Sequence, residues 1–270
     1  MSLMSINEVS HNFGGHDIFD NISLSLEHNS RIGLIGLNGS GKTTLFNILT
    51  GSLIPRRGTI QRARNLRVAY LSQEVELDES QTLHDCVSSA NSELTSLFDK
   101  LEASRAAVAK NHSEENMKLL EALEENYFQS GGYHFASEMK IVLAGLGFPQ
   151  DCWEREIIDF SGGEKTRIQF ARILLSPNDI FLLDEPTNHL DAETVYWLER
   201  HLQNYKGTVI AITHDRYFLD NVTGWILEVD RGQGIPYEGN YSSYLETKSK
   251  RLAQEAKKED SRQKTLAREL

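Results

Sequence analysis

The stretch Gly36–Thr43 (Gly-Leu-Asn-Gly-Ser-Gly-Lys-Thr) constrains the fold more than any other feature of this 270-residue chain. It fits G-x-x-x-x-G-K-[ST], the phosphate-binding loop, whose glycines let successive backbone N–H groups turn toward a polyphosphate. An apolar run at 31–35 predicts a buried strand before the loop. Helical spacing from Thr44 to Thr50, closed by Gly51, predicts a helix after it. The sequence therefore predicts a site for a nucleoside triphosphate.

The residue types of the loop suit this chemistry. Lys42 is placed to reach the β- and γ-phosphates, and the Thr43 hydroxyl is a candidate ligand for Mg²⁺. The following helix adds the positive end of its dipole. We expect nucleotide contacts from Gly36, Asn38, Gly39, Ser40, Gly41, Lys42, Thr43 and Thr44.

Composition limits the class of protein. The chain is 39% hydrophobic and 25% charged, ordinary values for a globular protein, and no apolar run approaches the roughly 20 residues that span a bilayer. No basic-then-apolar leader is visible, and Cys86 and Cys152 fit no metal spacing, which favours reduced thiols and a cytoplasmic location. A net charge of −11 argues against a surface that grips nucleic acid throughout, and a local basic patch is expected only at the C-terminus.

Strand and helix patterns succeed one another along the chain. Residues 4–30 predict a β-hairpin or a small antiparallel sheet, and 58–71 predict further strand. From 74 to 146 apolar residues recur at helical spacing, and Asn111-His112-Ser113 predicts the turn of an αα-hairpin. Strands return at 179–185 and 207–214, and 225–229 predicts an outer strand. These patterns favour an α/β fold with a mostly parallel core sheet, an antiparallel β subdomain and a helical subdomain.

Carboxylates and a histidine follow two of these apolar strands. Asp184 can hold Mg²⁺, and Glu185 can polarise the attacking water if the turn forced by Pro186 brings it to the γ-phosphate. His214 ends the next strand and could sense the γ-phosphate or orient the water. These are the candidate catalytic residues.

Two further features have both a structural and a functional interpretation. Ser161 and Glu164 form a capping box at the start of an amphipathic helix, yet Gly162 and Gly163 at that helix N-terminus could also bind an anion. Phe13 could stack on a base or could be an ordinary core aromatic.

The phosphate loop, Gln73, the Ser161–Lys165 motif, the Asp184–Asp191 motif and Thr213-His214-Asp215 occur here in one order. That set resembles the ATP-binding cassette (ABC) ATPase family. Within that family, two motifs are most similar to those of the ABC-F proteins, which lack membrane domains. They are Asn188-His189-Leu190-Asp191 and Gly239–Tyr244 (Gly-Asn-Tyr-Ser-Ser-Tyr).

The resemblance implies further roles. Phe13 would stack on adenine, and Gln73 would contact Mg²⁺ and the catalytic water. Residues Ser161, Gly162, Gly163 and Glu164 would clasp the γ-phosphate of an ATP held by a second ABC domain, and Asp191 would link the two composite sites. Residues 1–240 would form the ABC ATPase domain, with a helical insert at about 75–160, and 241–270 would start a charged helical linker.

The same resemblance implies the partners. A second ABC domain would come from a longer chain or from a second copy. The two domains would close over ATP and part after hydrolysis, acting as a clamp on the ribosome or, in a Uup-like branch, on DNA. RNA contact is expected from the C-terminal basic residues Lys248, Lys250, Arg251, Lys257, Lys258, Arg262, Lys264 and Arg268, unless these simply form a solvated helix. A nucleotide-binding subunit of a membrane transporter is the alternative, although it would need neither the helical insert nor the basic exit helix.

Overall fold

The computed structural model describes residues 2–14, 16–71, 77–188 and 190–254. The chain divides into two compact units. The first, here called the core unit, comprises 1–70, 179–190 and 198–270, and the second, the helical unit, comprises 71–178 and 191–197. Among the described helices, none combines the length and the apolar character needed to cross a bilayer.

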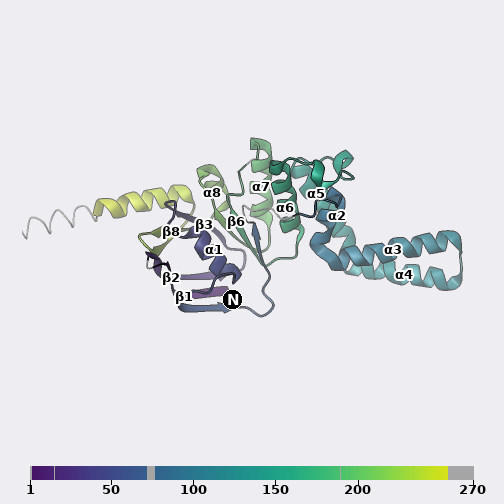
Figure 1. The fold of residues 1–270 in the computed structure, drawn as a ribbon, viewed down its shortest axis with the longest axis horizontal. Helices are drawn as coiled ribbons and strands as arrows, with labels where there is room; N and C mark the ends of the chain where they lie inside the picture. Colours follow the sequence, from purple (N-terminus) through teal and green to yellow (C-terminus); the bar gives the residue numbers. More distant parts are fainter. Residues whose placement is uncertain (1, 15, 72–76, 189, 255–270) are drawn as a thin grey trace, which may run out of the picture. The chain divides into compact units, whose positions relative to one another are not determined.

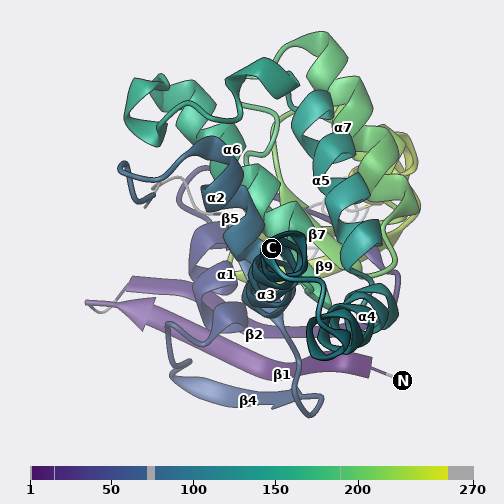
Figure 2. The ribbon, with the colours of Figure 1, turned by 90° about the vertical axis from the view of Figure 1, so that its right-hand side faces the viewer.

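A three-stranded antiparallel sheet begins the core unit. Strands β1 (Ser2–Phe13) and β2 (His16–Glu27) form the predicted hairpin, and β4 (Arg57–Arg62) pairs with the other side of β1 (Figure 2). The order is β2-β1-β4, so β4 is an edge strand. The predicted antiparallel subdomain is therefore confirmed.

The second sheet has six strands in the order β5-β6-β7-β3-β8-β9. Its members are β3 (Arg31–Gly36), β5 (Val68–Leu71), β6 (Ile180–Asp184), β7 (Thr208–Ile212), β8 (Trp225–Asp230) and β9 (Gln233–Glu238). The pairs β6–β7, β7–β3 and β3–β8 are parallel, which confirms the predicted mostly parallel sheet.

The prediction that 225–229 forms an outer strand was wrong. Strand β8 lies between β3 and the antiparallel β9, and β9 takes the edge. Pro236 cannot donate a ladder hydrogen bond, and such a residue is tolerated at a sheet edge. Gly234 and Pro236 also interrupt the apolar pattern, which is why sequence periodicity did not reveal β9.

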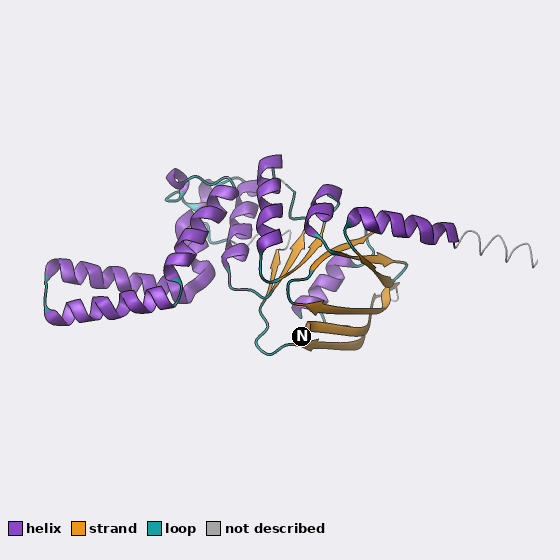
Figure 3. Ribbon diagram, turned by 180° about the vertical axis from the view of Figure 1, so that it is seen from behind, coloured by secondary structure: helices purple, strands orange, loops and turns teal. Residues whose placement is uncertain are grey.

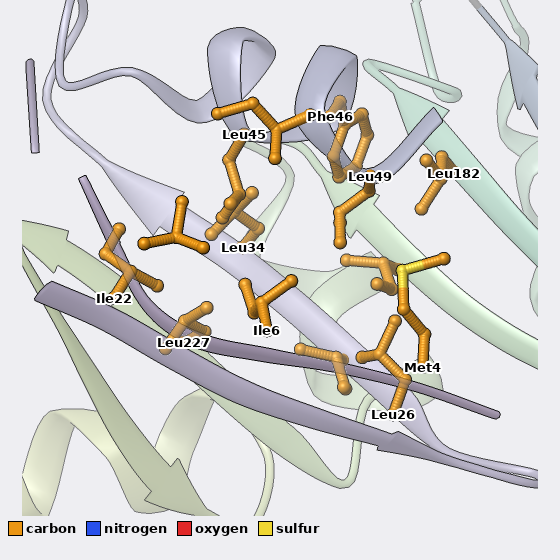
Figure 4. Packing of buried hydrophobic residues seen from close by; sticks show 14 of the residues in the cluster. Met4, Ile6, Ile22, Leu26, Leu34, Leu45, Phe46, Leu49, Leu182 and Leu227 are labelled. Carbon is orange, nitrogen blue, oxygen red and sulfur yellow. The ribbon is translucent and has the colours of Figure 1, made fainter. Parts of the chain in front are cut away.

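A large apolar cluster lies between the two sheets and α1 in the core unit. Helix α1 (Lys42–Thr50) buries Leu45, Phe46 and Leu49 against residues of both sheets, among them Ile6 and Leu34 (Figure 4). Gly51 ends the helix in the left-handed region, with a φ of 88°, as predicted. This packing fixes the start of α1, and with it the phosphate loop, on the sheet. Helices α7 (Ala192–Asn204) and α8 (Arg216–Val222) flank β7 and β8 in sequence.

The described residues of the helical unit form mainly helices and short 3₁₀ turns (Figure 3). The exceptions are Leu71, which ends β5, and an isolated antiparallel bridge between Thr82 and Glu156. Helices α3 (Ser92–Lys110) and α4 (Glu114–Gln129) lie side by side as the predicted αα-hairpin, and Ser113 caps α4 by accepting from the Asn116 N–H (Figure 1). The remaining elements are α2 (Leu83–Ser88), η1 (Ser89–Asn91), α5 (Gly132–Gly145), η2 (Gln150–Cys152), η3 (Ile157–Asp159) and α6 (Gly162–Leu175).

Candidate functional site

The phosphate loop joins β3 to α1 and depends on a glycine at its tightest point. Gly41 precedes the helix with a φ of 96°, and a Cβ there would lie 2.3 Å from Ile18 Cγ2 and 2.9 Å from Phe19 Cδ1. Both the backbone conformation and the close approach of β2 therefore require glycine. No side chain caps α1, and its first-turn N–H groups have no intrahelical acceptor, so they are open to an anion.

Lys42 lies across the loop that it follows. Its Nζ donates to the Gly36 carbonyl at 2.9 Å and to the Leu37 carbonyl at 3.1 Å. Partial burial lowers the pKa of Lys42, while the negative charges of Glu185 and Asp184 oppose that shift. The ammonium group is thus already held over the loop, next to two carboxylates.

Asp184 ends β6 beside α1. Its Oδ2 accepts from Thr43 Oγ1 at 3.2 Å and from the Tyr70 hydroxyl at 3.5 Å, and only 6% of the residue is exposed. Burial raises the pKa of Asp184, and the Thr43 hydrogen bond, Lys42 and Tyr70 oppose the rise. Burial and the neighbouring carboxylate raise the pKa of Tyr70 to about 12, so its hydroxyl remains a donor.

Glu185 and His214 face each other at the carboxyl ends of β6 and β7. Glu185 has a φ of 52°, a conformation that few non-glycine residues adopt, and its N–H donates to the Ile212 carbonyl at 2.7 Å. Glu185 Oε1 lies 3.7 Å from His214 Nε2, with the glutamate side chain 15% exposed and the histidine 69% exposed. The sequence analysis expected a turn forced by Pro186 to position the Glu185 carboxylate. In the structure the turn is at Glu185 itself, whose positive φ accompanies a carboxylate that faces His214.

The residues present fit a magnesium nucleotide. A hydroxyl and a carboxylate, Thr43 and Asp184, meet at hydrogen-bond distance, and Mg²⁺ takes oxygen ligands of this kind. The Ser40 hydroxyl oxygen is buried in the loop without a hydrogen-bond partner among the described residues. Because buried polar groups are normally satisfied, this oxygen indicates a polar ligand in the loop.

The Ser161 motif lies in the helical unit at the start of α6. Ser161 and Glu164 form the predicted capping box: Glu164 N–H donates to Ser161 Oγ at 3.3 Å, and Ser161 N–H donates to Glu164 Oε2 at 2.8 Å. The Ser161 hydroxyl also donates to Glu164 Oε2 at 2.7 Å, and this bond, together with that from the Ser161 N–H, lowers the pKa of Glu164. A Cβ on Gly162 would meet nothing within 4 Å, so no contact inside the chain requires a glycine at this position.

The structure distributes the predicted site residues between the two units. Lys42, Thr43, Asp184, Glu185 and His214 come together in the core unit. Ser161–Glu164 and Asp191 belong to the helical unit, where Asp191 Oδ1 accepts from the Thr194 N–H at 2.8 Å. Gln73 and the side chain of Phe13 lie outside the described residues, so their predicted roles stay predictions.

Comparison with known proteins identifies the family. The family model described as ABC transporter matches residues 19–188, and a second model of the same description matches 227–270. The chain belongs to the ABC transporter family. The family accounts for the nucleotide-binding character of the core unit, and the predicted ABC resemblance is confirmed.

Curated relatives align with nearly the whole of this ABC chain. It is 44% identical over 255 residues to the energy-dependent translational throttle protein EttA of Escherichia coli strain K12, which covers 94% of the chain and 46% of that protein. Identity to EttA of Mycobacterium tuberculosis strain H37Rv is 39%, and to the putative ATP-binding protein YdiF of Bacillus subtilis strain 168 it is 35%, covering 46% and 42% of those proteins. EttA is an ABC-F protein, so this similarity agrees with the ABC-F resemblance predicted from the motifs of this chain. The chain spans about half the length of the curated relatives it matches.

Solved structures agree on the fold. An ATP-binding subunit of an ABC transporter aligns with a TM-score of 0.64 at 18% identity, over 88% of this chain and 90% of that one. The archaeal ribosome recycling factor aABCE1, solved with the ribosomal stalk protein aP1, aligns with a TM-score of 0.63 at 23% identity, over 92% and 42%. Both comparisons confirm the ABC-type α/β architecture.

Two features of the core unit escaped the sequence reasoning. Tyr70 contacts the Asp184 carboxylate, although its only sequence signal is its position at the end of an apolar stretch. Lys248, predicted to contact RNA, instead pairs with the buried Glu228, which also accepts from the Tyr237 hydroxyl at 3.1 Å and the Tyr244 hydroxyl at 2.9 Å. Lys248 thus fastens the helical stretch 241–254 to β8 and β9, and its charge is not available as predicted.

Proposed function

We propose that this chain binds Mg²⁺-ATP and hydrolyses it as one half of a two-domain ABC clamp that acts on the ribosome during translation. One observation supports this chemistry most strongly. At the carboxyl ends of the parallel strands the structure brings together Lys42, Thr43, Asp184, Glu185 and His214. The 44% identity to EttA, whose name describes a translational throttle, supports the cellular role.

In this proposal the phosphate loop and the open N-terminus of α1 bind the phosphates through backbone N–H groups. The Lys42 ammonium exchanges the Gly36 and Leu37 carbonyls for oxygens of the β- and γ-phosphates. Mg²⁺, held by Thr43 and Asp184, would neutralise developing negative charge on the phosphates. The Ser40 hydroxyl gains the hydrogen-bond partner that it lacks among the described residues.

Glu185 then acts as general base. Its carboxylate accepts a proton from the attacking water while the bond from the water oxygen to the γ-phosphorus forms. The bond from the γ-phosphorus to the β–γ bridging oxygen breaks, and ADP leaves with that electron pair. His214, 3.7 Å from the Glu185 carboxylate, orients the glutamate or contacts the γ-phosphate.

The remaining predicted residues would complete a composite site. Phe13 would stack on the adenine and Gln73 would contact the metal and the water. Ser161, Gly162, Gly163 and Glu164 would close over ATP bound to a second ABC domain, with Asp191 linking the two sites. The open space above Gly162 supports such a docking role. In the same proposal, 1–240 is the ATPase domain, 241–270 begins a linker, and the protein works in the cytoplasm.

Co-sedimentation of the full-length natural protein with ribosomes tests the proposal. With the Glu185→Gln substitution, the amide cannot accept the proton, so the ATP-bound clamp should persist and ribosome association should require ATP rather than ADP. Association in neither nucleotide, with ATP binding shown separately by a fluorescent analogue, would refute the ribosome role. Co-purification with a membrane subunit would instead support a transporter subunit, which the similarity to EttA does not favour.

A further inference from the structure

A basic segment precedes the acidic part of the chain. Residues 28–73 contain none of the chain's 39 acidic residues and seven of its 28 lysines and arginines. Five of the seven are arginines within 56–67, the segment that contains β4. The expectation that basic charge concentrates only at the C-terminus was therefore wrong, because overall composition hides a local segregation of charge.

Two of these five arginines serve the fold. The Arg62 guanidinium donates to carbonyls at the end of α1, including that of Leu49 at 3.0 Å. Arg67 lies 3.7 Å from the Asp179 carboxylate. The side chains of Arg56, Arg57 and Arg64 are exposed and have no hydrogen-bond or ion-pair partner among the described residues. We call these three residues the arginine edge.

The arginine edge lies along the free side of the three-stranded sheet. Arg57 begins β4, Arg56 immediately precedes it, and Arg64 lies in the turn after it. Strand β4 is outermost in the sheet (Figure 2). The strand rises about 3.3 Å per residue, so Arg57 and the strand end at Arg62 lie about 16 Å apart, a length comparable to several phosphates of a nucleic-acid strand.

The outer face of the same sheet continues this edge with uncharged polar groups. On the inner face, Met4, Ile6 and Leu26 are buried in the core, and because strand side chains alternate, their neighbours point outward. Those neighbours are hydroxyl and amide residues that pair across the sheet: Ser5 with Ser25 and Gln61, and Asn7 with Thr59. Such side chains, with arginine, make most protein contacts to phosphate and sugar.

Protection of a free edge is a simpler role for charge on β4, since charged side chains discourage edge-to-edge pairing. It explains Arg57 but not Arg56 and Arg64, which lie outside the strand. Two acids lie nearby. Glu8 is exposed beside Gly58, where an added Cβ would come within 2.6 Å of the Glu8 carbonyl oxygen, and Asp20 accepts from Ser10 Oγ at 2.8 Å. Neither carboxylate forms an ion pair with the three guanidinium groups among the described residues.

We infer that the arginine edge and the outer face of the β2-β1-β4 sheet form a docking surface for the sugar–phosphate backbone of RNA. Guanidinium groups suit phosphate oxygens, and groups that both donate and accept, such as serine and asparagine, suit the ribose 2′-hydroxyl. The inference deepens the proposed ribosome role, on which the choice of RNA rests, by naming the surface that would contact ribosomal RNA.

The test compares the wild-type chain with a triple substitution, Arg56→Gln, Arg57→Gln and Arg64→Gln. The matched control removes the same charge at Lys100→Gln, Lys140→Gln and Lys206→Gln, three exposed lysines elsewhere in the chain. The probes are a fluorescein-labelled RNA hairpin, a DNA hairpin of the same sequence and vesicles of anionic phospholipid, titrated between about 50 and 200 mM salt. Arg64→Gln alone, outside the sheet, serves as a second variant that leaves strand pairing intact.

We expect the triple variant to bind the RNA hairpin at least about tenfold more weakly. The slope of the logarithm of its RNA affinity against the logarithm of the salt concentration should be shallower by about 2. Each lost phosphate contact removes about 0.7–0.9 from that slope. The control should bind RNA as wild type does, Arg64→Gln should weaken binding partway, and melting temperatures should be unchanged. Equal weakening in triple and control, failure of the wild type to bind RNA, or DNA or vesicle binding as tight as RNA binding would each overturn the inference.

Ribosome co-sedimentation separates this inference from the proposed function. If the triple variant sediments with ribosomes in ATP as well as the control does, the clamp proposal stands and the arginine edge is not the RNA contact. If the wild type sediments in neither nucleotide, the ribosome role fails, and the hairpin titration still decides whether the edge binds RNA.

Discussion

Removing the Lys248 ammonium should loosen the attachment of the stretch 241–254 to the sheet. Glu228 is only 4% exposed, and it accepts hydrogen bonds from Lys248, Tyr237 and Tyr244. Lys248→Met keeps most of the aliphatic length and leaves the buried carboxylate without its positive partner. Breaking a buried ion pair in this way typically costs about 3–5 kcal/mol. Because the Lys248 side chain is 30% exposed, we expect the lower end, about 3 kcal/mol.

That cost should depend on pH in a defined direction. Burial pushes the pKa of Glu228 upward, but the hydrogen bonds from Lys248 and the tyrosines outweigh it, so the pKa in the folded chain is below the ordinary glutamate value of 4.5. A depressed carboxylate pKa stabilises the fold above the unfolded-state pKa and loses that contribution as the pH falls. The gap between wild type and Lys248→Met should therefore be full at neutral pH and close below pH 4.5.

Thermal unfolding measures this gap. A loss of about 3 kcal/mol corresponds to a melting temperature lower by about 6–12 °C for a chain of this size. Lys250→Met is the matched control, because Lys250 is exposed on the same helical stretch and has no partner among the described residues, so its change should stay within about 0.5 kcal/mol. Equal shifts in the two variants, or a Lys248→Met shift that persists at acid pH, would refute the assignment of Lys248 to the buried pair.

Three further outcomes follow from the site and the core. Glu185→Gln should reduce ATP turnover at least about 100-fold while a fluorescent nucleotide still binds, because general-base catalysis contributes about that factor. Unchanged turnover would exclude Glu185 as the base. Gly41→Ala should abolish nucleotide binding in the same titration, since its φ of 96° and the 2.3 Å approach to Ile18 forbid a Cβ, and wild-type affinity would contradict this account of the loop. Phe46→Ala should cost about 3–5 kcal/mol in a denaturant titration because Phe46 is fully buried; a loss below about 1 kcal/mol would show that the core collapses around the gap.

The sequence was most informative where a local pattern and a chemical requirement coincide. The phosphate loop needs glycines at fixed offsets between a strand and a helix. Its sequence motif therefore predicted both the fold around the loop and the position of Lys42 and Thr43. Asp184 followed from the same logic, because a fully apolar strand has few reasons to end in a carboxylate. These residues lie together as expected.

Prediction failed where a tertiary contact decides the outcome. Whether Lys248 faces solvent or a buried carboxylate depends on Glu228, 20 residues earlier and on another element, which charge counting along a helix cannot reveal. Tyr70 escaped notice because its hydroxyl meets Asp184 only after two distant strands become neighbours. The positive φ of Glu185 is likewise imposed by a hydrogen bond to β7 rather than by the adjacent proline alone.

The arrangement of strands explains why the nucleotide loop and the stretch 241–254 depend on the same element. In the parallel register, Glu228 of β8 lies opposite Ile35 and Val229 opposite Gly36, the first residue of the phosphate loop. A Cβ on Gly36 would lie 2.6 Å from the Val229 carbonyl oxygen, so loop and strand are in close contact. A cavity of about 440 Å³ beside them has Lys42, His214, Tyr241 and Lys248 among its lining residues. Strand β8 thus supports the phosphate loop through its backbone and holds the helical stretch through the Glu228 side chain, so a change in the position of β8 would reach both.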